Sequence, residues 1–194
     1  LKADKPSIIK KIDGDKDIDV TTDDLVDYNT ALVGEKVPYV LQSKVPDMTG
    51  YTSYTYYVTD TFSAGLTFNN DIAITVGDKT LVKDTDFTVT QVGQVVTITF
   101  VDFLQYKNVK GADITITYTA TVNENAVIGV EGNPNTVNLT YSNNPQDNAS
   151  NDTTPDDTVV TYLVDLIINK TDEENKPLEG AEFAVKQGNT VIAT

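Results

Sequence analysis

The sequence of 194 residues contains no Cys, no His and no Trp. Without Cys the chain has no disulfide, no thiolate zinc site and no Cys nucleophile. Without His it lacks the commonest general base and metal ligand. Only 14 Lys plus Arg stand against 29 Asp plus Glu, which gives a formal net charge of −15. Nucleic-acid binding is therefore not expected, because phosphates are neutralised by clustered Lys and Arg. No cofactor is expected either.

Long hydrophobic runs are also missing, so the sequence predicts no segment that spans a bilayer. No signal peptide is present, yet the first residue is Leu1 rather than Met. We therefore expect a piece cut from a longer protein, whose location has to be inferred from other features.

Strand-forming residues dominate what is present, with many short alternations of polar and apolar positions separated by Gly, Pro and Asn turn signals. Such segments are 37–41, 54–58, 95–100, 114–118 and 137–141. This pattern predicts an all-β protein, an Ig-like β-sandwich with little helix. One short helix is expected over 23–32, capped by Thr22 or Asp23.

A change in composition divides the chain. Residues 143–157 contain no large apolar side chain, and a strongly apolar segment follows. We interpret 1–5 as a linker and 6–157 as one complete sandwich that includes an exposed connection over about 144–157. Residues 158–194 then form the truncated start of a second β-sandwich, because a few strands alone cannot bury a core.

Alternating aspartates near the start suggest a calcium loop. Asp13, Asp15 and Asp17 have the required spacing, but the sixth position, where the sharp turn needs Gly, is Ile18. A solvated acidic turn explains the same residues, so calcium is a weak alternative to the prediction of no metal site.

Three polar residues extend apolar strand faces at a period of two. Lys10 shares a face with Ile8 and Ile12; Asp60 shares one with Tyr54, Tyr56 and Val58; Asn143 shares one with Leu139 and Tyr141. Each residue taken alone is consistent with an exposed strand end, since Lys and Asp are rarely buried. The alternation also leaves Lys11 and Asn144 open as register alternatives.

Read together, these stretches resemble the middle domain of a Gram-positive, sortase-assembled backbone (major) pilin. The similarity rests on KPSIIKKIDG, on VGEKVPYVLQSKVPDMTGYTSYTYYVTDTFSAGLTF and on GNPNTVNLTYSNNP, and it covers roughly residues 5–160. In that family a Lys on the first strand, an acid before a Gly-Leu turn and an Asn closing the last strand form an internal isopeptide bond. The resemblance implies a cross-link between Lys10 and Asn143, with Asp60 as its catalytic acid.

The chemistry explains why those residue types are needed. An apolar pocket disfavours an ammonium, so Lys10 can become a nucleophilic amine. The same pocket favours a protonated Asp60, which can polarise the Asn carbonyl and shuttle protons while ammonia leaves. Fixed neighbours supply the proximity, so the reaction runs once and needs no enzyme. The chain is thus not expected to be an enzyme that turns over.

The C-terminal stretch LIINKTDEENKPLEGAEFAV resembles the start of a collagen-adhesin B-type domain. Lys170 matches that family's cross-linking Lys, and its partner would lie outside the chain. Glu182 falls in a packing motif rather than at the catalytic acid.

The resemblance implies a structural shaft subunit of a cell-wall pilus, extracellular, joined to other pilin subunits by sortase and in contact with host surfaces or matrix. The Tyr-Pro-Lys motif and the LPXTG-like signal that such joining needs do not occur here. A stalk or ligand-binding module of a non-polymerised cell-wall adhesin is the alternative. A carbohydrate-active enzyme is disfavoured, because no sugar-binding aromatic cluster is identifiable. The absence of Cys fits a surface protein whose covalent staple is not a disulfide.

Overall fold

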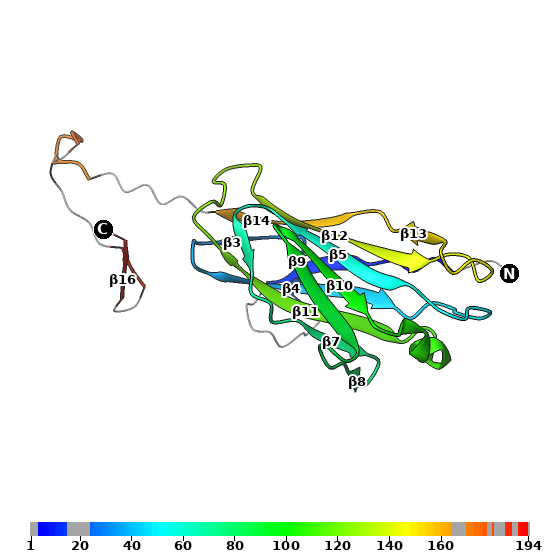
Figure 1. The fold of residues 1–194 in the computed structure, drawn as a ribbon. Helices are drawn as coiled ribbons and strands as arrows, with labels where there is room; N and C mark the ends of the chain where they lie inside the picture. The colour runs from blue at the N-terminus through cyan, green and yellow to red at the C-terminus, as the bar shows by residue number, and fades with distance from the viewer. Residues whose placement is uncertain are drawn as a thin grey trace. The chain divides into compact units, whose positions relative to one another are not determined.

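The fold is described from a computed structural model, which describes residues 4–14, 24–163, 170–177, 180, 185–187 and 190–193. The chain divides into two units, residues 1–164 and 165–194. The first unit is a sandwich of two sheets, and Figure 1 shows these sheets lying face to face. None of the helices among the described residues is long and apolar enough to cross a membrane.

Sheet A has the strand order β2-β1-β4-β11-β7-β8, with β6 also paired to β11. Its longest strands, β4 and β11, form the centre and pair antiparallel from Lys36↔Thr121 to Lys44↔Asp113. The strands of sheet A are β1 (Ile9–Asp13), β2 (Leu25–Val26), β4 (Lys36–Lys44), β6 (Leu66–Phe68), β7 (Ala73–Val76), β8 (Lys79–Thr80) and β11 (Asp113–Val122).

Sheet B has the strand order β3-β14-β12-β5-β10-β9, with β13 also paired to β12. All its pairs are antiparallel except β14 with β3. Its strands are β3 (Tyr28–Ala31), β5 (Tyr56–Phe62), β9 (Phe87–Val92), β10 (Val95–Phe100), β12 (Asn133–Ser142), β13 (Asn151–Thr153) and β14 (Asp157–Leu163). One 3-10 helix, η1 (Phe103–Val109), closes one end of the core, and its Phe103 stacks on Tyr56 with ring centroids 3.8 Å apart.

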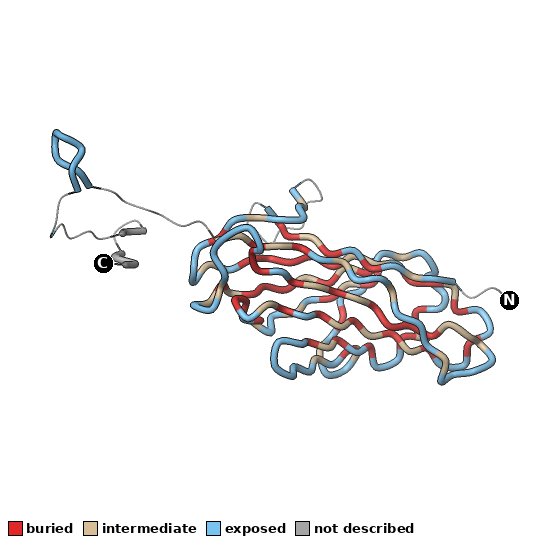
Figure 2. The backbone as a smooth tube through the Cα atoms, turned by 90° about the horizontal axis from the view of Figure 1, so that it is seen from above, coloured by how far each residue is buried: buried red, intermediate tan, exposed pale blue. Residues whose placement is uncertain are grey.

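The core lies between the sheets, where the alternating side chains of both point inward. In Figure 2 the buried positions recur along the strands, with exposed positions concentrated in the connections. In β5 the burial alternates from Tyr56 through Val58 and Asp60 to Phe62. This period of two is what a strand buried on one face requires, and it confirms the predicted all-β sandwich.

One local prediction is wrong. The helix expected at 23–32 is absent from its described part, where β2 and β3 form instead. Tyr28 to Ala31 pair in parallel with Val160 to Leu163, so contacts distant in the sequence override the local capping signal. The connection over 144–157 contains no buried residue, and it includes the short exposed strand β13, which pairs with Thr140 to Ser142 of β12.

The boundary of the sandwich also lies later than expected. Residues 158–163 belong to β14, which pairs with β12 on one side and β3 on the other. The first unit therefore extends to Val164 rather than ending at 157. The apolar segment after the polar connection completes sheet B and does not start a new domain. In the second unit, β15 (Val185–Gln187) and β16 (Thr190–Ala193) form an antiparallel pair.

Candidate functional site

Lys10 is a fully buried lysine in the centre of the sandwich. Its neighbours on the same face of β1, Ile8 and Ile12, are buried as well, and Lys10 itself is 0% exposed. Three aromatic rings surround its Nζ, with centroids at 5.1 Å (Tyr39), 5.7 Å (Phe62) and 5.4 Å (Tyr118). The prediction that Lys10 continues an apolar face is confirmed.

Asp60 is the acidic partner of this lysine. It lies on the inward face of β5, is 1% exposed, and its Oδ1 is 2.5 Å from the Nζ of Lys10. Burial lowers the pKa of Lys10 from 10.5 to about 8, although the negative charge of Asp60 acts in the opposite direction. The neutral amine of Lys10 is therefore easier to form in this pocket than in water. The predicted meeting of Lys10 and Asp60 is present.

The asparagine side chain that lies beside this pair is Asn135, which shares the hydroxyl of Tyr118 with Lys10 and Asp60. Asn135 is 0% exposed on β12, where it pairs in register with Phe62, while Val137 pairs with Asp60. Asn135 and Asp60 are thus diagonal neighbours on the inward face of sheet B. Sheet A supplies the lysine, and sheet B supplies the acid and the amide.

The structure does not bring Asn143 or Asn144 to the lysine. Asn143 follows the end of β12, and its Oδ1 accepts a hydrogen bond from Ser150. Asn144 accepts one from the backbone of Gln146. Lys11 points to the other face of β1, where it forms an ion pair with Asp27 at 2.5 Å. Of the four cross-link positions proposed from the sequence, only Lys10 lies in the buried cluster.

Tyr118 of β11 connects the three buried groups through a single hydroxyl. Its Oη accepts a hydrogen bond from Lys10 Nζ at 2.6 Å and from Asn135 Nδ2 at 3.2 Å, and it donates one to Asp60 Oδ2. Burial, followed by the charge of Asp60, raises the pKa of Tyr118. The hydroxyl therefore stays protonated. Sequence analysis did not single out this residue, although the alternation in 114–118 placed it on the inward face.

The carbonyl side of Asn135 is open to a new interaction. Among the described residues, its Oδ1 is buried without a hydrogen-bond partner, as are Tyr39 Oη and Thr161 Oγ1. The side chains of Thr161 and Asn135 both lie close enough to Tyr39 to lower its pKa, although burial raises that pKa overall. A buried acceptor without a donor is costly. Here it leaves the carbonyl free to gain a donor when negative charge develops on its oxygen.

Strand β1 is held over this pocket by a further carboxylate. Asp157 at the start of β14 accepts a hydrogen bond at 2.7 Å from the backbone N–H of Lys10. The lysine is thus fixed at both ends, its backbone by sheet B and its Nζ by Asp60 and Tyr118. Such fixing restricts the amine to one position, which is the condition for a proximity-driven reaction.

The remaining described candidates from the sequence lie outside the buried cluster. Asp15 and Asp17 of the calcium alternative lie outside the described residues, as does Glu182; Asp13 is buried at the end of β1. No group of acids suited to a metal ion occurs among the described residues. Lys170 is exposed.

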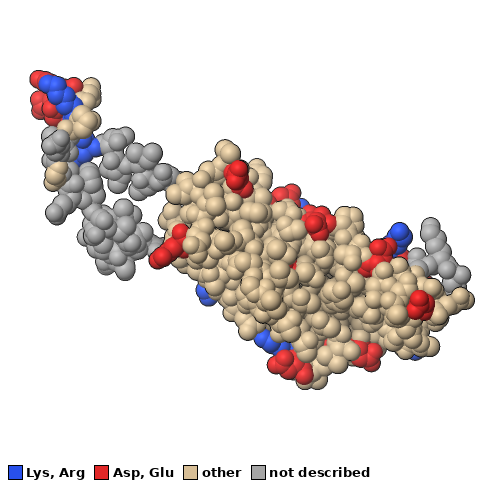
Figure 3. Space-filling model, turned by 45° about the horizontal axis from the view of Figure 1, so that its top comes forward, with Lys and Arg blue, Asp and Glu red and all other residues tan. Residues whose placement is uncertain are grey.

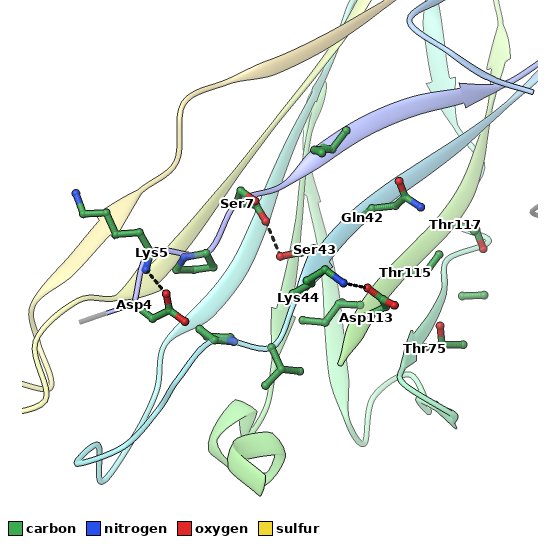
Figure 4. Close-up of a pocket in the computed structure, with 16 residues that line it drawn as sticks. Asp4, Lys5, Ser7, Gln42, Ser43, Lys44, Thr75, Asp113, Thr115 and Thr117 are labelled. Atoms are coloured by element: carbon green, nitrogen blue, oxygen red, sulfur yellow. Dashed lines mark hydrogen bonds and ion pairs between the residues drawn. The ribbon is translucent and has the colours of Figure 1, made fainter. Parts of the chain in front are cut away.

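A groove on the outer face of sheet A is separate from the buried cluster. Its volume is about 850 Å³, and Figure 4 shows it between the N-terminal segment and the outward side chains Gln42, Thr75, Thr115 and Thr117. Lys44 and Asp113 form an ion pair at its edge. None of the buried cluster lines this groove. The buried cluster and this groove are therefore separate features of the sandwich.

The surface carries scattered charge. On the face in Figure 3, acidic side chains are dispersed over the sandwich, and the few basic ones stand apart from one another. This agrees with the net charge of −15, and that face has no basic patch of the kind nucleic acids need.

Comparisons with known proteins agree on one family. The family model described as Gram-positive pilin backbone subunit 2, Cna-B-like domain, matches residues 33–145. The trypsin-resistant surface T6 protein of Streptococcus pyogenes is 31% identical over 95% of this chain and 37% of its own length. The chain thus spans little more than a third of that relative.

Two solved structures show the same fold. A C-terminal fragment of the major pilin of Streptococcus agalactiae superposes with a TM-score of 0.72, at 21% identity, over 90% of this chain and 61% of that one. The T6 backbone pilin of Streptococcus pyogenes gives a TM-score of 0.62, at 26% identity, over 89% of this chain and 39% of that one. The T6 backbone pilin has a modular three-domain structure.

Proposed function

Because the chain belongs to the Gram-positive pilin backbone family, we propose that it is part of the shaft subunit of a pilus on the cell surface, joined covalently to other pilin subunits. The arrangement of the sandwich supports this role. Residues 4–8 approach it at the end opposite to the one where β14 finishes (Figure 1). Copies joined through their two ends would therefore each add the length of the sandwich to a fibre.

The proposed role includes an internal isopeptide bond between Lys10 and Asn135, with Asp60 as the catalytic acid. The observation that carries it is the buried Lys10–Asp60 pair that shares Tyr118 with Asn135. Burying an ion pair costs more than it returns unless the geometry is excellent. A reaction that consumes the lysine's charge removes that cost. The cross-linking reaction therefore explains why the pair is buried, whereas a contribution to stability does not.

The steps balance without a cofactor. Lys10 passes a proton to Asp60 and becomes a neutral amine. Its Nζ attacks Cγ of Asn135, and a tetrahedral intermediate forms with negative charge on Oδ1. The Cγ–Nδ2 bond then breaks as Asp60 gives its proton to Nδ2, which leaves as ammonia, and Nζ gives its second proton to Asp60. The products are one amide, one ammonia and a protonated Asp60, which has carried a proton between the two nitrogens.

Intact mass tests the bond directly. We expect the purified chain to weigh about 17 Da less than its sequence mass, because one ammonia is lost, and we expect Asp60→Ala to have the full sequence mass. An unreduced mass for the wild-type chain would refute the cross-link. A 17 Da loss that persists in Asp60→Ala would remove Asp60 from the mechanism.

Peptide mapping then assigns the atoms. A bond on Lys10 blocks trypsin after that residue but not after Lys11, so the linked product should contain residues 3–11. Chymotrypsin cuts after Leu139 and Tyr141 and thereby separates Asn135 from Asn143. Residues 3–11 should be linked to the fragment with Asn135. A link to the fragment with Asn143 would show that the buried trio is not the reacting one.

The shaft role has its own test. Antibodies raised against this chain should detect a ladder of covalent multimers, stable in hot detergent, in cell-wall extracts of the source organism. Loss of the cell's sortase should collapse the ladder to the single subunit. One wall-anchored band in the presence of sortase would instead favour the stalk of a non-polymerised adhesin.

A further inference from the structure

Asp60 and Asn135 are not in hydrogen-bond contact. Among the described residues, Asp60 accepts hydrogen bonds from Lys10 and Tyr118, and the Nδ2 of Asn135 donates one to Tyr118. If Asp60 were the only proton carrier, it would have to reach the Nδ2 of Asn135 directly. That nitrogen is already hydrogen-bonded to Tyr118. The hydroxyl of Tyr118 lies within 3.2 Å of Asn135 Nδ2 and is hydrogen-bonded to Asp60 Oδ2.

We propose that the Tyr118 hydroxyl is a catalytic proton relay, which carries the proton of Asp60 to the departing amide nitrogen of Asn135. The inference rests on the proposed Lys10–Asn135 cross-link and assigns one step within it. Lys10 first gives a proton to Tyr118 Oη while the Tyr118 O–H proton passes to Asp60 Oδ2, along the hydrogen bonds already present. As the tetrahedral intermediate collapses, Asp60 Oδ2 returns that proton to Tyr118 Oη, the Tyr118 O–H proton moves to Nδ2, and Nζ gives its second proton to Asp60 Oδ1. Ammonia leaves, and Tyr118 is a neutral phenol before and after.

The surroundings suit a relay and not a permanent base. Tyr118 is 3% exposed, and its ring stacks on Tyr39 with centroids 5.4 Å apart, so the hydroxyl cannot swing away. The burial that raises its pKa keeps the phenol protonated and therefore able to donate. Asp60 accepts from Lys10 through one carboxylate oxygen and from Tyr118 through the other. A proton that leaves Oδ2 for Tyr118 can thus be replaced at Oδ1 by the second proton of Nζ, without rotation of the side chain.

The test follows the reaction in newly made protein. The full chain is translated in vitro in a short pulse, and samples of the chase are quenched in acid and weighed, which gives the rate of the 17 Da loss. A parallel sample receives a brief trypsin pulse to measure the folded fraction. We expect Tyr118→Phe to lose ammonia about 100-fold more slowly than wild type, at the low end of general acid catalysis. It should accumulate molecules that are folded and unreacted.

Tyr56→Phe is the matched control. Tyr56 is also a buried tyrosine with one side-chain hydrogen bond, to Ser43 at 2.8 Å, and it lies outside the reacting cluster. Its rate should stay within about threefold of wild type, a barrier change of less than 1 kcal/mol. A Tyr118→Phe chain that reacts as fast as the control would overturn the relay and leave the cross-link standing. A slow rate explained entirely by a low folded fraction would also overturn it, while a wild-type chain that never loses 17 Da would overturn the cross-link itself.

Discussion

Asn135→Ala should keep the full sequence mass and lose about 5 kcal/mol of unfolding free energy. The proposed bond closes a loop of 126 residues, from Lys10 to Asn135. Restricting the unfolded chain by a loop of that length is worth about 5 kcal/mol in the loop-entropy model. For a unit of this size, such a loss lowers the melting temperature by roughly 10–20 °C. Thermal unfolding followed by circular dichroism, with intact mass on the same sample, measures both effects.

Two variants separate the covalent effect from local packing. Asn143→Ala alters an amide outside the pocket, so it should retain both the 17 Da loss and the wild-type melting temperature. Asp60→Ala blocks the reaction by another route but also leaves the Lys10 ammonium without its buried partner, so it should melt at or below Asn135→Ala. If Asp60→Ala melted near wild type, the cross-link would not account for the loss in Asn135→Ala.

Force applied to the two chain ends should extend the wild-type sandwich far less than its Asn135→Ala variant. In the linked chain, tension passes from Lys10 through the new amide to Asn135, and the 124 residues between them are bypassed. Without the bond that segment unravels and adds about 450 Å of contour length, at about 3.6 Å for each residue. Single-molecule pulling with handles at both ends of the chain measures the difference.

The trace of Asn143→Ala serves as the reference for this experiment. It should match the wild type, because its cross-link is intact. Release of the full segment from the wild-type chain at forces that leave covalent bonds unbroken would mean that no bond between Lys10 and Asn135 closes the loop.

Local alternation predicted most of the sandwich and two members of its buried cluster. Lys10 and Asp60 could be predicted because each occupies an alternate position on the apolar face of its strand. Asn135 shares the face of Val137, Leu139 and Tyr141, but it lies near the start of β12 and immediately after Pro134, a residue type that is common in turns. The resemblance to the family placed the amide at the other end of the strand. Which end meets Lys10 depends on how β12 pairs with β5, and such pairing joins positions more than 70 residues apart.

The missed features have the same physical origin. β3 forms because residues 28–31 find β14 beside them, about 130 positions away in the chain. Tyr118 could be predicted as buried, but its three hydrogen bonds come from β1, β5 and β12, and only the packing of two sheets brings these strands together. Side-chain alternation specifies a face, whereas strand pairing and sheet packing specify the neighbours on it.

The pocket takes its groups from four strands that are distant in the sequence, and Asp157 at the start of a fifth fixes the backbone of the lysine. Ammonia can therefore leave only after both sheets have closed around the core. A nascent chain whose last strand is still inside the ribosome lacks the Asp157 anchor. On the proposed chemistry, the missing 17 Da is a lasting record that a given molecule once folded completely. The mass difference survives denaturation. The intact mass of a denatured sample therefore gives the fraction of its molecules that had folded.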